Sequence, residues 1–103
     1  MKRSFRTEPE ASAELEEAAL WYSARRSGLG VEFVEAFDLV LDQIGRWPEI
    51  GHLVPGVPAD VPTRRFPLNR FPYYVAYMEW EGNIRVLAVA HDHRKPGYWF
   101  SRI

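Results

Sequence analysis

The segment YYVAYMEWEGNIRVLAVAH, residues 73–91, decides how this chain folds. It holds two runs rich in β-branched and aromatic residues, 73–80 and 84–91, and such runs are typical of strands. Between them lies EGN, residues 81–83, which has the composition of a tight turn. The segment therefore predicts an antiparallel β-hairpin, and we expect a third strand in TRRFPL, residues 63–68, beside it.

The second strand of this hairpin is largely apolar on both faces. Strict alternation separates its residues into two sets, Ile84, Val86, Ala88 and Ala90 on one side and Arg85, Leu87, Val89 and His91 on the other. A strand of this kind lies in the centre of a sheet or is covered on both sides. We expect helices to cover one face and PGYWFSRI, residues 96–103, to cover part of the other.

Upstream of these strands the apolar pattern changes to that of two amphipathic helices. The first spans about residues 8–26, and Thr7 and Glu10 of TEPE predict a capping box at its start. Gly28 ends it in the left-handed conformation. The second helix stops before Pro48. Its apolar stripe consists of Phe33, Phe37, Val40, Ile44 and Trp47. Two such helices joined by four residues predict an antiparallel helix hairpin.

The full order is a short strand in KRSFR, residues 2–6, then two helices, then three strands. Residues 48–63 contain four prolines and two glycines, which predict a long irregular connection. The chain is therefore expected to be α+β, with a helix hairpin packed on a small antiparallel sheet and a short C-terminal turn or helix. A length of 103 residues suits one domain over residues 1–103.

Composition limits where the protein works and what it binds. The chain has no cysteine, which excludes disulfides and thiolate metal ligands. Its first ten residues, MKRSFRTEPE, lack the apolar core of a signal peptide, and no apolar run is long enough to span a bilayer. We expect a cytoplasmic protein that uses no cofactor and has no membrane partner.

The charge is small in total but unevenly placed. The formal net charge is −1, yet residues 1–50 hold six basic and ten acidic side chains (net −4), and residues 51–103 hold seven and four (net +3). One interpretation is Glu-rich helices beside strands that carry some arginine. The other is a basic working face opposite an acidic back.

The run AVAHDHRKPGYW, residues 88–99, concentrates reactive side chains near the C-terminus. His91 and His93 are too few for a metal site, which uses three or four convergent ligands, so we expect no metal. Tyr98 and Trp99 follow a Pro–Gly turn, and either pack back onto the sheet or take part in chemistry.

Basic residues accumulate in the strand half of the chain. They include Arg64, Arg65, Arg70, Arg85, Arg94 and Lys95. Arginine binds phosphate through two parallel hydrogen bonds, and tyrosine and tryptophan rings stack on bases, so a nucleic-acid interface is one interpretation. The alternative is arginine side chains that extend over aromatic packing to reach water. The sequence contains no glycine-rich phosphate loop and no serine-centred nucleophile motif.

Taken in order, these segments resemble the RelE/ParE family, the toxins of bacterial type II toxin–antitoxin modules. The resemblance covers nearly the whole chain and rests on EAALWYSARRSGLGVEFVEAF (17–37), the stop at Pro48, RRFPLNRFPYYVAYM (64–78) and IRVLAVAHDHRKPGYWFSR (84–102). It implies a helix hairpin on a small antiparallel sheet and a role in growth inhibition or plasmid stabilisation. It also implies a cognate antitoxin whose extended segment wraps the toxin, and we expect that segment to lie over the helix hairpin.

The family uses this fold in two ways. One branch cleaves messenger RNA in the ribosome with basic residues and a C-terminal tyrosine or histidine, and the other binds DNA gyrase and poisons it. Under the ribonuclease reading, the resemblance assigns catalysis to Arg65, Arg85, His91 and Tyr98. Independently of that hypothesis, we expect Arg64, Arg70, Arg94 and Trp99 to be binding residues.

Gyrase binding is our first hypothesis for the target. The sequence pI is about 6.3, and the chain has only two lysines. Proteins that bind the ribosome or RNA gain affinity from many phosphate contacts, which this composition does not favour. A ribosome-dependent endoribonuclease is the second hypothesis, and a non-toxic, binding-only family member is the third.

Overall fold

The β-hairpin predicted from residues 73–91 forms the centre of the molecule. In the computed structural model, which describes residues 3–103, β4 (Tyr73–Trp80) pairs antiparallel with β5 (Asn83–His91). Glu81 and Gly82 join them with φ angles of 51° and 78°. Two successive positive φ values make a type I′ turn, whose twist matches that of the strands it joins. The predicted hairpin and its turn are confirmed.

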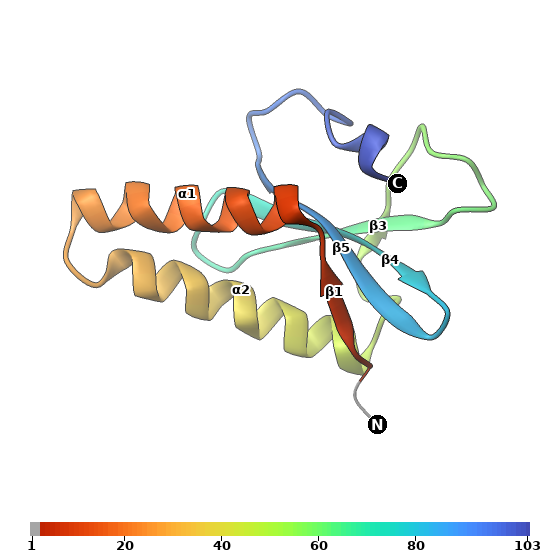
Figure 1. The fold of residues 1–103 in the computed structure, drawn as a ribbon, viewed down its shortest axis with the longest axis horizontal. Helices are drawn as coiled ribbons and strands as arrows, with labels where there is room; N and C mark the ends of the chain where they lie inside the picture. The colour runs from red at the N-terminus through yellow and green to blue at the C-terminus, as the bar shows by residue number, and fades with distance from the viewer. Residues whose placement is uncertain (1–2) are drawn as a thin grey trace.

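The remaining strands extend this hairpin on both sides (Figure 1). β1 (Phe5–Thr7) runs parallel to β5, β3 (Thr63–Pro67) pairs antiparallel with β4, and β2 (His52–Leu53) lies at the far edge. The order β1-β5-β4-β3-β2 puts β5 inside the sheet, as its apolar faces predict. The predicted start of the first strand at Lys2 falls outside the described residues.

Two features of the sheet were not predicted. The sheet is mixed because β1 is parallel to β5, whereas a purely antiparallel sheet was expected. The proline-rich connection also contributes β2, in which His52 and Leu53 pair with Arg65 and Arg64. A two-residue strand is too short to show a period in the sequence.

The helices form the expected hairpin, with α1 (Pro9–Arg25) and α2 (Leu29–Arg46) side by side (Figure 1). Gly28 has a φ of 85° between them. Close to it, a Cβ at Gly30 would lie 2.4 Å from the carbonyl oxygen of Ala19, so this glycine allows the helices to approach closely. The predicted capping box is wrong, since the cap is Glu8 and makes no side-chain cap bond. Thr7 instead belongs to β1.

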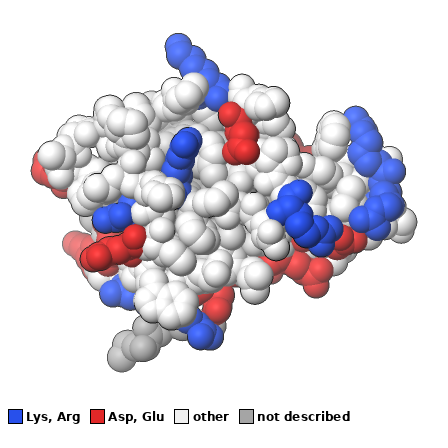
Figure 2. Space-filling view, turned by 180° about the vertical axis from the view of Figure 1, so that it is seen from behind, with Lys and Arg blue, Asp and Glu red and all other residues white. Residues whose placement is uncertain are grey.

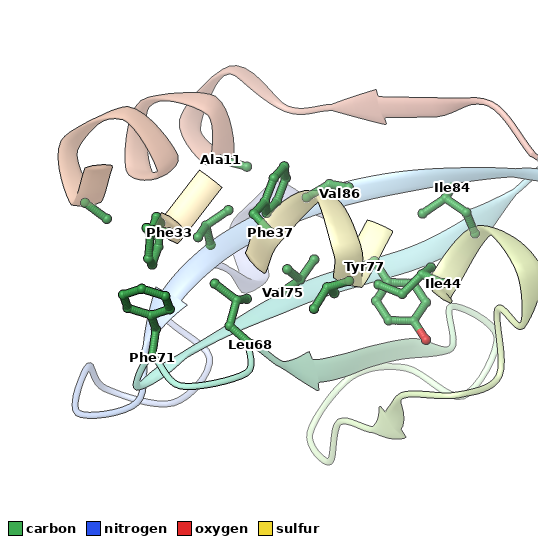
Figure 3. Close-up of a cluster of buried hydrophobic side chains, with 13 residues drawn as sticks. Ala11, Phe33, Phe37, Ile44, Leu68, Phe71, Val75, Tyr77, Ile84 and Val86 are labelled. Atoms are coloured by element: carbon green, nitrogen blue, oxygen red, sulfur yellow. The ribbon is translucent and has the colours of Figure 1, made fainter. Parts of the chain in front are cut away.

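The first layer of the core lies between the helices and the sheet (Figure 3). Phe33, Phe37 and Ile44 of α2 point at the same apolar cluster as Val75 and Val86 of the sheet, as the stripe predicts. The exception is Trp47, which is 59% exposed. The helix ends at Arg46, and the backbone of Trp47 turns away from helical geometry (φ −134°, ψ 81°), so its side chain leaves the stripe.

A β-bulge divides the faces of β5 differently from strict alternation. Ala76 pairs with Ala88 while Tyr77 pairs with Val86, so Leu87 is an extra residue in β5. Beyond it the faces exchange: Val89 belongs to the helix-side core, whereas Leu87 and Ala88 belong to the opposite cluster. The predicted division of this strand is therefore wrong after residue 87, because a bulge resets the alternation.

The C-terminal segment covers this opposite face, as predicted. A 3₁₀ turn at Phe100–Arg102 follows Trp99, whose side chain is 1% exposed. The indole N–H of Trp99 donates to the hydroxyl of Tyr74 at 3.0 Å. Both faces of β5 are thus buried. Within residues 3–103, neither helix has the length and hydropathy needed to cross a bilayer.

Candidate functional site

The carboxylate of Glu14 on α1 organises the region that follows β5. Its Oε1 accepts the backbone N–H of Val89 at 3.0 Å and Nη1–H of Arg102 at 2.9 Å. Its Oε2 accepts the hydroxyl of Tyr98 at 2.6 Å, Nη2–H of Arg102 at 3.1 Å and Nη1–H of Arg94 at 3.5 Å. These five residues, called here the Glu14 cluster, fasten the C-terminal segment to α1 and β5.

The electrostatics of the cluster favour a proton that stays on Tyr98. Burial raises the pKa of the Tyr98 phenol, and its hydrogen bond to the Glu14 carboxylate raises it further. The same carboxylate raises the pKa of Arg102 through the paired hydrogen bonds between them. The arrangement is therefore a bidentate ion pair joined by a neutral phenol, which suits structure better than proton transfer near neutral pH.

A cleft of about 580 Å³ opens beside the cluster, between α1 and the ends of β4 and β5. We call it the α1–β5 cleft. It is lined by Glu14, Glu17, Ala18, Trp21, Tyr22, Pro72, Tyr73, Val89, His91 and Arg94. Its apolar and aromatic walls and few polar groups are typical of ligand and peptide sites.

Four aromatic rings form one wall of the cleft. Ring centroids lie 5.1 Å apart between Trp21 and Tyr22, 6.2 Å between Tyr22 and Tyr73, and 5.0 Å between Tyr73 and His91. The guanidinium of Arg25 lies 3.8 Å from the centroid of Trp21, which holds that ring although it is 52% exposed. The four rings thus contact one another in sequence along the cleft.

The residues assigned to ribonuclease catalysis do not gather in one place. Arg85 makes hydrogen bonds to the Glu8 carboxylate and to the carbonyl oxygen of Arg102, on the sheet face covered by the C-terminal segment. His91 contacts Tyr73 and lines the α1–β5 cleft. The prediction that Arg85 and His91 share a face is wrong, because the bulge at Leu87 lies between them.

The other two assigned residues are also apart. Arg65 is exposed on β3, with its guanidinium 5.2 Å from the ring centroid of Tyr74, and it lines a different pocket with His52 and Asp92. Tyr98 belongs to the Glu14 cluster.

The residues assigned to surface binding mostly hold the fold together. Arg64 donates to the carbonyl oxygen of Gly51 at 2.8 Å, and Arg70 pairs with Glu32 at 2.7 Å. That ion pair lowers the pKa of the Glu32 carboxyl. The guanidinium of Arg94 lies over the ring of Tyr98, 3.7 Å from its centroid, and Trp99 is buried.

Comparison with known proteins shows to which family this chain belongs. A sequence model of the ParE toxin of type II toxin–antitoxin systems (parDE) matches residues 5–96. The chain belongs to the ParE toxin family. Among solved structures it is similar to the chromosomal ParDE toxin–antitoxin system from P. aeruginosa, with a TM-score of 0.59 and 18% identity over 87% of this chain and 96% of that one. At this identity the likeness shows the fold alone. No curated protein sequence matches the chain.

The surface of this ParE-family toxin carries no broad basic region on the face seen in Figure 2, where basic residues stand in small groups, several beside acidic ones. Ion pairs explain this mixture. Carboxylates within 4.0 Å pair with Arg3, Arg6, Arg26, Arg46, Arg70, Arg85, Arg94 and Arg102. Across residues 3–103 the structure also shows no group of three histidine, aspartate or glutamate side chains suited to a metal ion, and His91 and His93 contact each other edge to face.

Sequence reasoning missed Glu14, Arg102 and the aromatic wall of this ParE-family toxin. The contacts of Glu14 span 75 to 88 positions along the chain, so no local pattern reports them. Trp21 offered a signal, because a large aromatic residue beside the apolar stripe of an amphipathic helix exposes its ring at the edge of the core.

Proposed function

We propose that this ParE-family protein inhibits growth by binding DNA gyrase, and that a cognate antitoxin neutralises it. Membership in the ParE family supports the antitoxin, because toxins of type II modules are made together with one. The solved relative is a ParDE system, which supports the same partner.

One observation supports gyrase rather than messenger RNA as the target of this protein. Two of the four residues that the ribonuclease hypothesis assigns to catalysis, Arg85 and Tyr98, are already committed to contacts within the fold. Tyr98 donates to Glu14 and keeps its proton, while Arg85 is bound between Glu8 and the carbonyl of Arg102. General acid–base catalysis needs groups free to reach the substrate, so their engagement supports inhibition by binding.

The charge distribution supports the same proposal. Cleavage on the ribosome requires affinity for a dense array of phosphates. In residues 3–103, Arg25, Arg65 and Lys95 are the basic residues without an ion pair or a backbone hydrogen bond among the described contacts, and they lie on different elements. A protein surface is a better match for such isolated cations than an RNA backbone.

The test is induced expression in a bacterial host with separate labelling of new DNA and new protein over minutes. We expect DNA synthesis to fall first, together with a DNA-damage response, and purified protein to inhibit supercoiling by gyrase. Tyr98→Phe serves as the matched variant, since it removes one hydroxyl and should leave this inhibition unchanged. Early loss of protein synthesis that disappears in Tyr98→Phe would instead establish the endoribonuclease, and normal growth would establish the binding-only member.

A further inference from the structure

The α1–β5 cleft combines an open aromatic wall with polar groups that lack partners. Burial raises the pKa of Tyr22 and of Tyr73, and for Tyr73 the neighbouring Tyr22 phenol raises it further. Both hydroxyls therefore stay protonated. Within residues 3–103 neither hydroxyl has a hydrogen-bond partner, and no buried side-chain polar atom is left unsatisfied, so both reach solvent. They are available to a ligand in a cleft that their own rings line.

His91 adds a donor at one end of this wall. Its Nδ1 accepts the backbone N–H of His93 at 3.0 Å, so the neutral imidazole carries its proton on Nε2. Arg94 lines the cleft at the same end of β5, with its side chain 55% exposed. The donors at this end are the Tyr73 hydroxyl, Nε2–H of His91 and the exposed part of the Arg94 guanidinium, whose Nη1 also pairs with Glu14, and together they suit an anionic acceptor.

Two carboxylates also line the cleft, and their positions decide where that acceptor can lie. Glu14 already accepts five hydrogen bonds, and Arg102 neutralises its charge. Glu17 is exposed on α1 between Glu14 and Trp21, one helical turn before Trp21. The cleft thus offers apolar rings near Trp21 and donors near His91.

We propose that the α1–β5 cleft binds a bulky apolar side chain next to a carboxylate, presented by an acidic segment of the antitoxin. The apolar group packs on Trp21 and Tyr22, and the carboxylate accepts from Tyr73, His91 and Arg94. The cleft volume of about 580 Å³ accommodates one such pair of side chains. The inference deepens the proposed function and rests on it in one respect, namely that an antitoxin is the partner.

The first experiment needs no antitoxin. Labelled protein is titrated with 3-phenylpropionate at millimolar concentration, and NMR spectra are followed at the side chains of Trp21, Tyr73 and His91. We expect shifts at all three residues, and clearly smaller ones with 3-phenylpropanamide, which has the same ring and no charge. Equal shifts with the amide, or none with the acid, would overturn the assignment of a carboxylate.

The second experiment uses the antitoxin encoded beside the toxin and two matched tryptophans. Trp21 and Trp80 are 52% and 51% exposed, and Trp80 lies at the far end of the β4–β5 hairpin. We expect Trp21→Ala to weaken antitoxin binding about tenfold or more, and Trp80→Ala less than about twofold. Tyr73→Phe keeps the ring and should weaken binding about fivefold. Equal effects of the two tryptophan variants would overturn the proposal.

The two proposals fail in different ways. Tight antitoxin binding that Trp21→Ala leaves unchanged removes the cleft proposal and leaves gyrase inhibition intact. Normal gyrase activity in the presence of the toxin removes the target, while the phenylpropionate shifts still report on the cleft. Unfolding curves of each variant show whether a loss of binding reflects a loss of fold.

Discussion

The Glu14 cluster and the α1–β5 cleft lie next to each other on α1. The side chains of the cluster form hydrogen bonds to one another, whereas several side chains of the cleft are exposed to solvent. Glu14 and Trp21 are seven residues apart, which places them two turns apart on the same side of the helix. The Glu14 carboxylate accepts hydrogen bonds from Val89, Arg94, Tyr98 and Arg102. Around Trp21 a large ring is half exposed, and two tyrosine hydroxyls have no partner within residues 3–103.

This difference separates residues that hold the fold from residues that can bind. Buried polar groups that satisfy one another stabilise a unique arrangement and have little left to offer a ligand. Exposed rings and unpaired donors cost the free protein little and gain when a partner covers them. The comparison therefore assigns Tyr98 to structure and supports the binding role proposed for Tyr73, although both are tyrosines near the end of β5.

The largest expected effect on stability comes from removing the buried ring of Trp99, next to the Glu14 cluster. Trp99→Ala deletes a side chain that is 1% exposed and leaves the Tyr74 hydroxyl without its donor. We expect a loss of about 4 kcal/mol in the free energy of unfolding, measured by urea denaturation. A loss below about 1 kcal/mol would mean that the C-terminal segment is only loosely attached.

The next effect tests the carboxylate at the centre of the cluster. Glu14→Gln keeps the shape but removes the charge that pairs with Arg102, whose side chain is only 15% exposed. We expect a loss of about 3 kcal/mol in the same measurement, because breaking a largely buried ion pair leaves a charge uncompensated. Glu17→Gln is the control on the same helix and should change stability by less than about 0.5 kcal/mol. Similar losses in both would contradict the distinction between cluster and cleft.

The sequence predicted those parts of the molecule whose causes are local. The β4–β5 hairpin follows from two strand-like runs and a turn, and the helix hairpin follows from apolar spacing and Gly28. The bulge at Leu87 has no such signal, since it arises from how β5 fits β4. Its consequence is large, because it moves Arg85 and His91 to opposite faces and so separates two residues that alternation had joined.

The candidate site was predicted less well for a related reason. His91, Arg94 and Tyr98 were recognised as a reactive run, but the roles of Arg94 and Tyr98 depend on Glu14, more than seventy positions earlier in the chain. Residue type shows that a tyrosine can donate a proton or a hydrogen bond. Only the fold shows whether its acceptor is another part of the same protein, as for Tyr98, or whether it has none among residues 3–103, as for Tyr73.

The smallest expected effects come from two substitutions that each remove one hydroxyl oxygen, one in the Glu14 cluster and one in the α1–β5 cleft. Together they give the sharpest test of the comparison between these regions. Tyr98→Phe loses a hydrogen bond of 2.6 Å to a carboxylate and should cost about 1.5 kcal/mol in unfolding free energy. Tyr73→Phe loses a hydroxyl that has no partner within residues 3–103 and should change stability by less than about 0.5 kcal/mol.

Alkaline unfolding separates Tyr98 from the other tyrosines. The fold raises the pKa of Tyr98, so its contribution is complete below the ordinary tyrosine pKa of about 10. As the pH rises above that value, the unfolded chain releases the proton while the folded chain retains it, and stability falls. Tyr98→Phe should lose less stability than the wild type over this range, measured by urea unfolding at successive pH values. Parallel losses in the two proteins would show that the Tyr98 proton is not held by the Glu14 cluster, and the phenol would then be free for the chemistry that its position next to the cleft allows.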